Sequence, residues 1–387
     1  MLRVMVSCGE PSGDVYAAAL AAALRDREPG LDVFGFGGPA CRAAGVRLVG
    51  DYTGLAVTGL TEVVRVLPAT FAMLRRLADA AEATRPDALV LVDYPDFNFQ
   101  LMKRVAPRGI PVVYYVTPQL WAWRAGRMKT MQRHVALALP IFPFEEALYR
   151  DAGVPVKFLG HPLVDSVPAP EADAVAATAR QHALRVALGL DPSRPTVALL
   201  PGSRHNEVSR LVPPIAEALP AIRAAVPDVQ FAIACAPGRR RDEFAAMLAA
   251  EPSTPVVEQR TDDVLAAADV VITASGTATA QTALHARPMV VIYKLSGLTY
   301  ALGKPLVRID TYAMANLIAG ETVVPELIQD ACTGEAIARE TVSFLTDRDR
   351  WTRTHARLAE TRAKLGAPGS TGRVADAVLD VARRPRA

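Results

Sequence analysis

The sequence predicts an α/β protein with two successive units, each built on a parallel sheet with helices on its faces. Short runs rich in Val, Leu and Ile are continuously apolar, which is typical of strands buried on both faces. They alternate with longer alanine-rich stretches of helical period, and this order predicts right-handed strand–helix–strand connections. The pattern stops at a proline-rich segment and then restarts. A chain of 387 residues is also longer than one hydrophobic core usually supports.

The first unit is expected over residues 1–165. The run at 2–7 leads through a glycine-containing turn into a helix predicted over 15–25. The strands of this unit are predicted at the apolar runs 2–7, 33–36, 88–92, 112–116 and 135–139.

Residues 166–194 are expected to form a linker, because prolines gather there around one short helix near 174–188. The second unit is expected over 195–340. Its strands are predicted at 197–200, 229–234, 256–257, 270–273 and 290–293. The last stretch, 341–387, is polar, arginine-rich and helical in period, so it either packs along the outside or returns to the first unit. Two such units predict an interdomain cleft at the carboxyl ends of their strands, where open α/β sheets bind ligands.

Composition excludes several classes of protein. The 43 basic residues are offset by 40 acids, and no nucleic-acid-binding module is recognisable, so nucleic acid is not an expected partner. The four cysteines form no C-x-x-C pair, and no histidine spacing is typical of a metal site, so neither metal nor cofactor is expected. No charged leader opens the chain, and no apolar run reaches the roughly 18 residues that span a bilayer. The expected location is cytoplasmic, at most peripheral on the inner face of the cytoplasmic membrane.

Two loops after predicted strands are candidate anion sites. Gly202, Ser203 and Arg204 follow the strand at 197–200, and Ser275, Gly276 and Thr277 follow the strand at 270–273. Glycine lets backbone amides approach an anion, and a helix N-terminus with one arginine can neutralise a diphosphate. Ordinary helix capping is the alternative for either loop alone. Two such loops, expected about two strands apart in one sheet, favour a nucleoside diphosphate.

Another strand end carries carboxylates. Asp93 directly follows the apolar run 88–92, and Asp96 and Asn98 come next in a short turn. A carboxylate at the carboxyl end of a strand is well placed to act as a general base. The alternative is that one of the two aspartates caps the following helix, which suits Asp96 better.

Three further places offer polar groups to a ligand. The first is the turn that carries Glu10, Ser12 and Asp14, which otherwise is a plain corner with Ser12 or Asp14 as N-cap. The second is His161, at the junction of the units. In the third, Trp121 and Trp123 are interleaved with cations from Arg124 to His134, a pattern that suits a phosphorylated or interfacial ligand and would also suit single-stranded nucleic acid. The basic apolar stretch 62–76 indicates membrane-surface contact or, more simply, a helix packed on its own sheet.

Taken in order along the chain, these loops resemble the bacterial lipid-A-disaccharide synthase family almost from end to end. The matching stretches are 9–14 (Gly-Glu-Pro-Ser-Gly-Asp), 93–98 (Asp-Tyr-Pro-Asp-Phe-Asn), 115–124, 142–145 (Phe-Pro-Phe-Glu), 160–162 (Gly-His-Pro), 200–204 (Leu-Pro-Gly-Ser-Arg), 274–278 (Ala-Ser-Gly-Thr-Ala) and 316–320 (Asn-Leu-Ile-Ala-Gly). Any one of them is weak evidence, whereas the ordered set is specific.

The resemblance implies an inverting glycosyltransferase of the GT-B type, with two Rossmann-like domains. By resemblance, the donor is UDP-2,3-diacylglucosamine and the acceptor is 2,3-diacylglucosamine 1-phosphate, an acylated glucosamine phosphate held at the membrane surface. The products are the β-1′,6-linked disaccharide 1-phosphate and UDP. Asp93 would be the general base, Arg204 and the 275–277 helix start would hold the diphosphate, and Asn316 would line the donor side.

Two positions depart from the family pattern. Gln281 stands where the family carries a glutamate that holds the ribose hydroxyls of UDP, so one charged hydrogen bond is replaced by a neutral one. Charged hydrogen bonds contribute roughly 1.5–3 kcal/mol and neutral ones about 1 kcal/mol, so weaker donor binding is expected. Pro11 replaces a more usual threonine and stiffens its turn.

The alternatives are another UDP-sugar enzyme of the same architecture, such as a 2-epimerase or a different lipid glycosyltransferase, and a non-catalytic UDP-sugar-binding homologue. The loss of charge at residue 281 motivates the last of these. The arginine-rich C-terminal helices are equally compatible with packing inside one chain and exchange between two, so a homodimer is an open alternative.

Overall fold

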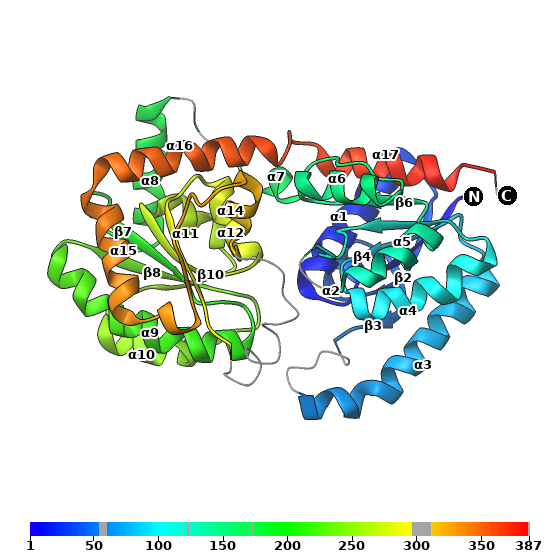
Figure 1. The fold of residues 1–387 in the computed structure, drawn as a ribbon, viewed down its shortest axis with the longest axis horizontal. Helices are drawn as coiled ribbons and strands as arrows, with labels where there is room; N and C mark the ends of the chain where they lie inside the picture. The colour runs from blue at the N-terminus through cyan, green and yellow to red at the C-terminus, as the bar shows by residue number, and fades with distance from the viewer. Residues whose placement is uncertain (54–59, 122–123, 170, 172, 296–310, 386–387) are drawn as a thin grey trace. The chain divides into compact units, whose positions relative to one another are not determined.

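The computed structural model describes residues 1–53, 60–121, 124–169, 171, 173–295 and 311–385, with the side chains of 60–66 outside the description. Contacts divide the chain into two compact units (Figure 1). One contains Met1–Ser166 together with Leu365–Ala387, and the other contains Val167–Lys364.

The first unit is built on a parallel sheet in the order β3-β2-β1-β4-β5-β6. Its central strands β1 and β4 are apolar and almost wholly buried, because helices cover both faces. The strands are β1 (Arg3–Ser7), β2 (Asp32–Gly37), β3 (Arg47–Asp51), β4 (Ala88–Val92), β5 (Val112–Tyr115) and β6 (Leu137–Leu139).

Proline opens several helices of this unit. It stands at the first helical position of α1, α2, α4 and α6, where no amide donor is needed and the fixed φ suits the helix. The α-helices are α1 (Pro11–Arg27), α2 (Pro39–Ala43), α3 (Leu60–Thr84), α4 (Pro95–Val105), α5 (Met128–His134), α6 (Pro143–Asp151), α7 (Leu163–Ser166) and α17 (Ser370–Ala382), with 3-10 turns η1 (Ala106–Arg108) and η2 (Ala125–Arg127).

The second unit repeats the same topology with the order β9-β8-β7-β10-β11-β12, again all parallel. Numbered within each unit, both sheets read 3-2-1-4-5-6, the order of doubly wound nucleotide-binding folds. The strands are β7 (Thr196–Leu200), β8 (Gln230–Cys235), β9 (Val256–Glu258), β10 (Val270–Ala274), β11 (Met289–Tyr293) and β12 (Glu326–Ile328).

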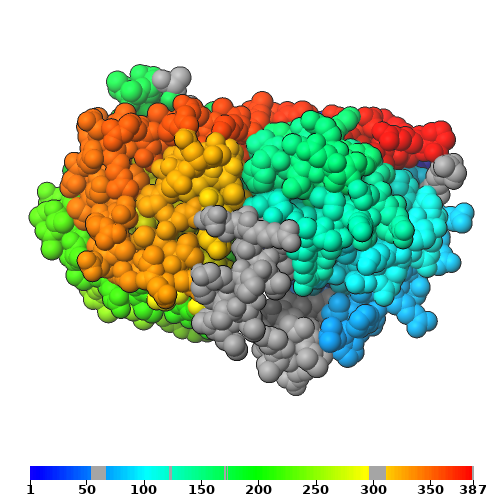
Figure 2. All heavy atoms as spheres, viewed as in Figure 1, coloured from blue at the N-terminus to red at the C-terminus, as the bar shows by residue number. Residues whose placement is uncertain are grey.

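The helices of this unit cover both faces of its sheet, and α15 and α16 form part of its surface (Figure 2). They are α8 (Ala174–Ala187), α9 (His205–Ala225), α10 (Ala245–Ala250), α11 (Thr261–Ala267), α12 (Thr277–Leu284), α14 (Met314–Ala319), α15 (Gly334–Thr346) and α16 (Arg348–Lys364), with 3-10 turns η3 (Arg241–Phe244) and η5 (Gln329–Ala331). No helix among the described residues has the length and apolar character needed to cross a membrane.

The chain end returns to the first unit, where α17 lies beside α1 (Figure 1). The carboxylate of Asp165 accepts hydrogen bonds from three successive amides at the start of α17, at 2.7–3.0 Å. Arg27 of α1 pairs with Asp376 at 2.5 Å. The expected C-terminal segment 341–387 is thus shared, with α16 in the second unit and α17 in the first.

The topology fixes where ligands are expected. In a 3-2-1-4-5-6 sheet the order in which strands are added reverses between the first and fourth strands, and ligands bind beyond the carboxyl ends of these two strands. In the first unit these are β1 and β4, and in the second they are β7 and β10. The candidate loops at 9–14, 93–98, 201–204 and 275–277 follow these four strands.

Candidate active site

Asp93 lies at the first turn beyond β4, on a strained backbone. Asp93 and Tyr94 both have positive φ, +49° and +47°, and Pro95 begins α4 immediately afterwards. The left-handed conformation costs a non-glycine residue roughly 1–2 kcal/mol, so two in succession persist only where neighbours impose them. Tyr94, rather than either aspartate, is the N-cap residue of α4. The capping alternative for Asp96 is therefore wrong.

Buried hydrogen bonds hold this turn. The amide of Asn98, fully buried, donates to the carbonyl oxygens of Asp93 at 2.7 Å and of Val92 and Ser7 at 3.3 Å. Its oxygen accepts from the Ser7 hydroxyl at 2.7 Å. The Tyr114 hydroxyl donates to the same Asp93 carbonyl at 3.1 Å. Asn98 therefore supports the Asp93 backbone from inside the unit and is not exposed to a ligand.

The turn after β1 packs against this one. A Cβ at Gly9 would lie 2.1 Å from the Tyr94 ring, so glycine is needed for the two turns to meet. Glu10 is the N-cap residue of α1, and Ser12 is exposed in its first turn. Because Glu10 is the N-cap residue, the N-cap expected at Ser12 or Asp14 is wrong.

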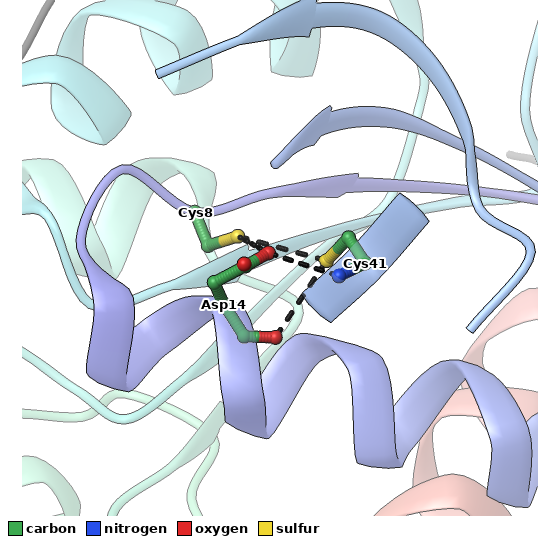
Figure 3. Close-up of side chains that lie close together, drawn as sticks. All are labelled: Cys8, Asp14 and Cys41. Carbon is green, nitrogen blue, oxygen red and sulfur yellow. Dashed lines mark hydrogen bonds between the residues drawn. The ribbon is translucent and has the colours of Figure 1, made fainter. Parts of the chain in front are cut away.

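Asp14 serves the fold. It is 2% exposed, and its carboxylate accepts from the amides of Gly38, Ala40 and Cys41 at 2.8–3.1 Å, which joins α1 to the start of α2. Cys8 and Cys41 lie beside it with sulfurs 3.9 Å apart (Figure 3). Among the described residues this trio is the one group with metal-ligand atoms close together. The carboxylate is already occupied by backbone donors and two thiols complete no four-ligand set, so the cluster is explained by helix capping and core packing.

A cluster of charged side chains, Asp96, Arg124 and Arg127, lies beside the loop that follows β5. The Asp96 carboxylate, on the exposed side of α4, pairs with both Arg124 and Arg127. Burial opposes its charge, but the two guanidinium groups outweigh burial and lower the pKa of Asp96. Asp96 therefore holds Arg124 in place. Trp123 and the side chains of 63–66 lie outside the described residues.

Trp121 is held by a buried acid. Its indole nitrogen donates to Glu145 at 3.0 Å, and its ring meets Phe144 edge-on at 5.2 Å. Glu145 is wholly buried, and burial raises its pKa to about 8 despite hydrogen bonds from Trp121 and the Phe142 amide. The sequence places Glu145 in the family-like stretch 142–145 and beside an aromatic run, but neither signal singled it out as a site residue.

His161 is also structural. It is fully buried, its Nδ1 accepts from the Leu163 amide at 3.1 Å, and its own amide donates to the Leu365 carbonyl at 2.8 Å. Burial lowers its pKa to about 3, so the ring stays neutral. His161 thus helps to attach the returning chain end to the first unit.

In the second unit, the first candidate anion loop precedes α9. Gly202 has φ +117°, a conformation that glycine adopts at little cost, and a Cβ there would lie 2.9 Å from Glu207. The Glu207 carboxylate accepts from the amides of Ser203 and Arg204 at 3.3 Å, which shapes the loop. The Arg204 side chain is 64% exposed, with one guanidinium nitrogen 3.4 Å from Glu207.

The second anion loop precedes α12. The Ser275 hydroxyl donates to the Tyr312 carbonyl at 2.9 Å, Gly276 has φ +132°, and Thr277 is the exposed first residue of the helix. The N-cap residue of this helix is Gly276, which has no side chain to cap the helix start. The two loops leave adjacent strands, β7 and β10, and the expected separation of two strands is wrong, because β8 and β9 are added on the other side of β7. Adjacency brings the loops closer than expected.

Asn316 is buried, and its side chain makes hydrogen bonds mainly to backbone groups. Its amide nitrogen donates to the Val324 carbonyl and to Glu326, and its oxygen accepts from the Val323 and Val324 amides, at 2.7–2.9 Å. Asn316 therefore joins α14 to the segment before β12. Any effect of Asn316 on a sugar donor is exerted through that segment.

These features define a class. Two sheets of order 3-2-1-4-5-6, each with polar loops at its switch point, are the GT-B architecture shared by nucleotide-sugar glycosyltransferases and epimerases. The UDP-GlcNAc 2-epimerase from Neisseria meningitidis bound to UDP-GlcNAc gives a TM-score of 0.67 at 12% identity, covering 98% of this chain and 100% of that one. Acinetobacter baumannii MurG gives 0.58 at 14% identity, covering 98% and 100%. At these identities the likeness shows the fold alone.

Sequence comparison gives the particular family. The profile described as lipid-A-disaccharide synthetase matches residues 4–378. The lipid-A-disaccharide synthase of Anaeromyxobacter sp. (strain K) is 43% identical over 383 residues, covering 98% of each chain. That of Myxococcus xanthus (strain DK1622) is 42% identical over 380 residues, covering 98% of this chain and 97% of that one. The chain belongs to the lipid-A-disaccharide synthase family. The predicted family, fold class and glycosyltransferase class are confirmed.

Proposed function

We propose that this chain transfers the acylated glucosaminyl group of UDP-2,3-diacylglucosamine to the 6-hydroxyl of 2,3-diacylglucosamine 1-phosphate. The products are the β-1′,6-linked disaccharide 1-phosphate and UDP. One observation carries the assignment of residues: the switch point of the first sheet bears a carboxylate, and that of the second bears the two candidate anion loops.

Asp93 is assigned as the general base. As the acceptor oxygen attacks C1 of the donor, Asp93 takes the hydroxyl proton, and the bond from C1 to the diphosphate oxygen breaks with inversion at C1. The supporting observation is that buried hydrogen bonds to Asn98 and Tyr114 keep the Asp93 backbone in one strained conformation. Such preorganisation places the carboxylate before substrate arrives.

The second unit is assigned to the donor. The exposed guanidinium of Arg204 and the start of α12, whose N-cap residue is Gly276, supply positive charge to the diphosphate as it leaves. Gly202 and Ser203 shape the first loop, and Ser275, Gly276 and Thr277 shape the second. Gln281, one turn further along α12, is assigned to the ribose of UDP.

The loop after β5 is assigned to the acceptor. Arg124, held by Asp96, and Trp121, held by Glu145, offer a cation and an aromatic face to a sugar phosphate. Glu10 and Ser12, at the start of α1, complete the polar groups on this unit. Asp14, Asn98 and His161 support these groups from the interior.

The lipid acyl chains imply contact with the membrane surface. On α3, Leu67 and Phe71 are 42% and 56% exposed, and Arg75 and Arg76 lie within two turns of Phe71. Burying one such apolar side chain contributes roughly 1.5–3 kcal/mol, so replacing Leu67 and Phe71 by Gln should weaken binding to phosphatidylglycerol vesicles at least about tenfold. The matched control replaces Val175 and Val186, which are 75% and 61% exposed on α8, by Gln. Equal loss in both variants would contradict a specific role for α3.

The assignment of the base is tested with two neighbouring aspartates. Asp93→Asn should lower turnover by about 100-fold or more, as expected for loss of a general base, and leave UDP binding unchanged. Asp96→Asn should instead raise the KM for the acceptor, because it releases Arg124. If Asp93→Asn weakens UDP binding as much as turnover, Asp93 is not the base.

A further inference from the structure

Gln281 does not stand alone on α12. Its amide nitrogen lies 2.9 Å from Oδ1 of Asp262, a residue in the first turn of α11. Nε2 of His285, the C-cap residue of α12, lies 2.8 Å from the same oxygen. The Asp262 side chain is 38% exposed and that of His285 is 9% exposed. A carboxylate thus lies directly behind the glutamine and still reaches solvent.

The chemistry of the three groups fixes their orientation. An ionised carboxylate only accepts hydrogen bonds, so the groups facing Asp262 are the NH₂ of Gln281 and the protonated Nε2 of His285. The amide oxygen of Gln281 then points away from Asp262. Burial opposes the charge on Asp262, but hydrogen bonds from His285 and Gln281 outweigh burial and lower the pKa of this carboxyl.

A ribose presents two hydroxyl donors, and doubly wound folds recognise them with the carboxylate of an Asp or Glu. The family resemblance places such an acid at residue 281 on α12, where this chain has the neutral amide of Gln281. We infer that Asp262 supplies from α11 the negative charge that binds the ribose hydroxyls of the nucleotide, acting together with the amide oxygen of Gln281. This inference rests on the proposed use of the second unit for the UDP-sugar.

Gln281 and Asp262 together carry a single negative charge, which avoids repulsion between two carboxylates. A glutamate at 281 would place a second carboxylate about 3 Å from Asp262, and two like charges at that separation strongly disfavour each other. Glutamine instead donates to Asp262 and keeps it in position, while His285 holds it from the other side. The neutral residue on α12 and the acid on α11 are therefore two parts of one binding group.

The test measures the affinity of the full chain for UDP and for 2′-deoxy-UDP by titration calorimetry. Four proteins are compared: the unaltered chain, Asp262→Asn, Gln281→Glu and the double variant. Asp262→Asn should weaken UDP about tenfold and weaken 2′-deoxy-UDP less, because that nucleotide keeps only the 3′-hydroxyl, so the preference for the ribose falls. Gln281→Glu alone should also weaken UDP, and the double variant should recover most of the affinity, because one carboxylate is restored without repulsion.

Asp263→Asn is the matched control. Asp263 is the next residue on α11, its side chain is 39% exposed, and it pairs with Arg260 at 2.7 Å. It should leave both affinities within about twofold of the unaltered chain, the range of a surface change. An unchanged ribose preference in Asp262→Asn, or tighter UDP binding in Gln281→Glu alone, would overturn the role of Asp262. Failure of the unaltered chain to bind UDP would overturn the donor assignment itself, and the two failures are therefore distinct.

Discussion

Replacing Asn98 by Ala should allow the turn at Asp93 and Tyr94 to leave its strained backbone conformation. Asn98 makes four hydrogen bonds, three to backbone carbonyls and one from the Ser7 hydroxyl, all in the interior of the first unit. The amide nitrogen shares two hydrogens among the three carbonyls, so the side chain makes three full-strength bonds, which at about 1 kcal/mol each contribute roughly 3 kcal/mol. The two left-handed residues they support cost roughly 2–4 kcal/mol together. Because the two magnitudes are similar, the turn should relax once Asn98 is gone, and the Asp93 carboxylate should leave its position.

Two milder variants, compared with Asn98→Ala, distinguish loss of the Asp93 position from general destabilisation of the protein. Tyr114→Phe removes one donor to the Asp93 carbonyl, and Ser7→Ala removes the hydrogen bond that orients the Asn98 amide. Each should lower the free energy of unfolding by about 1 kcal/mol, against about 3 kcal/mol for Asn98→Ala.

Urea unfolding measures stability, and turnover is measured on protein that is fully folded at the assay temperature. Turnover should fall in the same order, at least about tenfold for Asn98→Ala, since small displacements of a reacting group are costly. UDP binding should not change. The reasoning is refuted if Asn98→Ala loses stability as expected but its turnover equals that of the unaltered chain.

Three further variants probe buried and exposed charge. The pKa of Glu145 is raised to about 8 from an ordinary 4.5, so its contribution to stability is full below pH 4.5 and is lost as the pH rises toward 8. Glu145→Gln should therefore gain about 3 kcal/mol relative to the unaltered chain between pH 4.5 and pH 7 in urea unfolding, and parallel pH profiles would contradict this. The pKa of His161 is lowered to about 3 from 6.5, so the unfolded state takes up the proton first and stability falls as the pH drops below 6.5. His161→Asn should remove about 2 kcal/mol of the loss between pH 6.5 and pH 5, whatever its effect at pH 7.5, and an unchanged slope would mean that the ring is charged in the fold. Arg204→Ala should raise the KM for the donor about 10- to 100-fold, the range of a charged hydrogen bond, with the KM for the acceptor unchanged; equal donor KM in the two proteins would remove Arg204 from the diphosphate site.

The fold could be predicted closely from apolar runs. The predicted strand 88–92 coincides with β4, and 270–273 lies within β10. The strands that were missed, β3 and β12, lie at sheet edges and carry charged or polar residues, so they contain no continuous apolar run. Adjacency of β7 and β10 was also missed, because order in the chain does not reveal on which side of a sheet later strands are added.

The chemistry at strand ends was predictable, but the use of each polar residue was not. Asp93 was identified because a carboxylate follows an apolar strand directly. Asp14 and Asn98 lie in the helices that follow β1 and β4, yet their side chains contact backbone 24 and 91 residues away in sequence. Asp262 was missed because its partnership with Gln281 spans 19 residues and two helices. Such roles depend on tertiary contacts that no local pattern records.

The central claim is transfer of an acylated sugar from UDP to a lipid acceptor, and release of UDP tests it most directly. The purified chain is incubated with UDP-2,3-diacylglucosamine, with and without 2,3-diacylglucosamine 1-phosphate, in the presence of EDTA. The account predicts UDP release that requires the acceptor, persists with the chelator and yields a disaccharide 1-phosphate. UDP that stays bound without release, or conversion of the UDP-sugar without any acceptor, would contradict it.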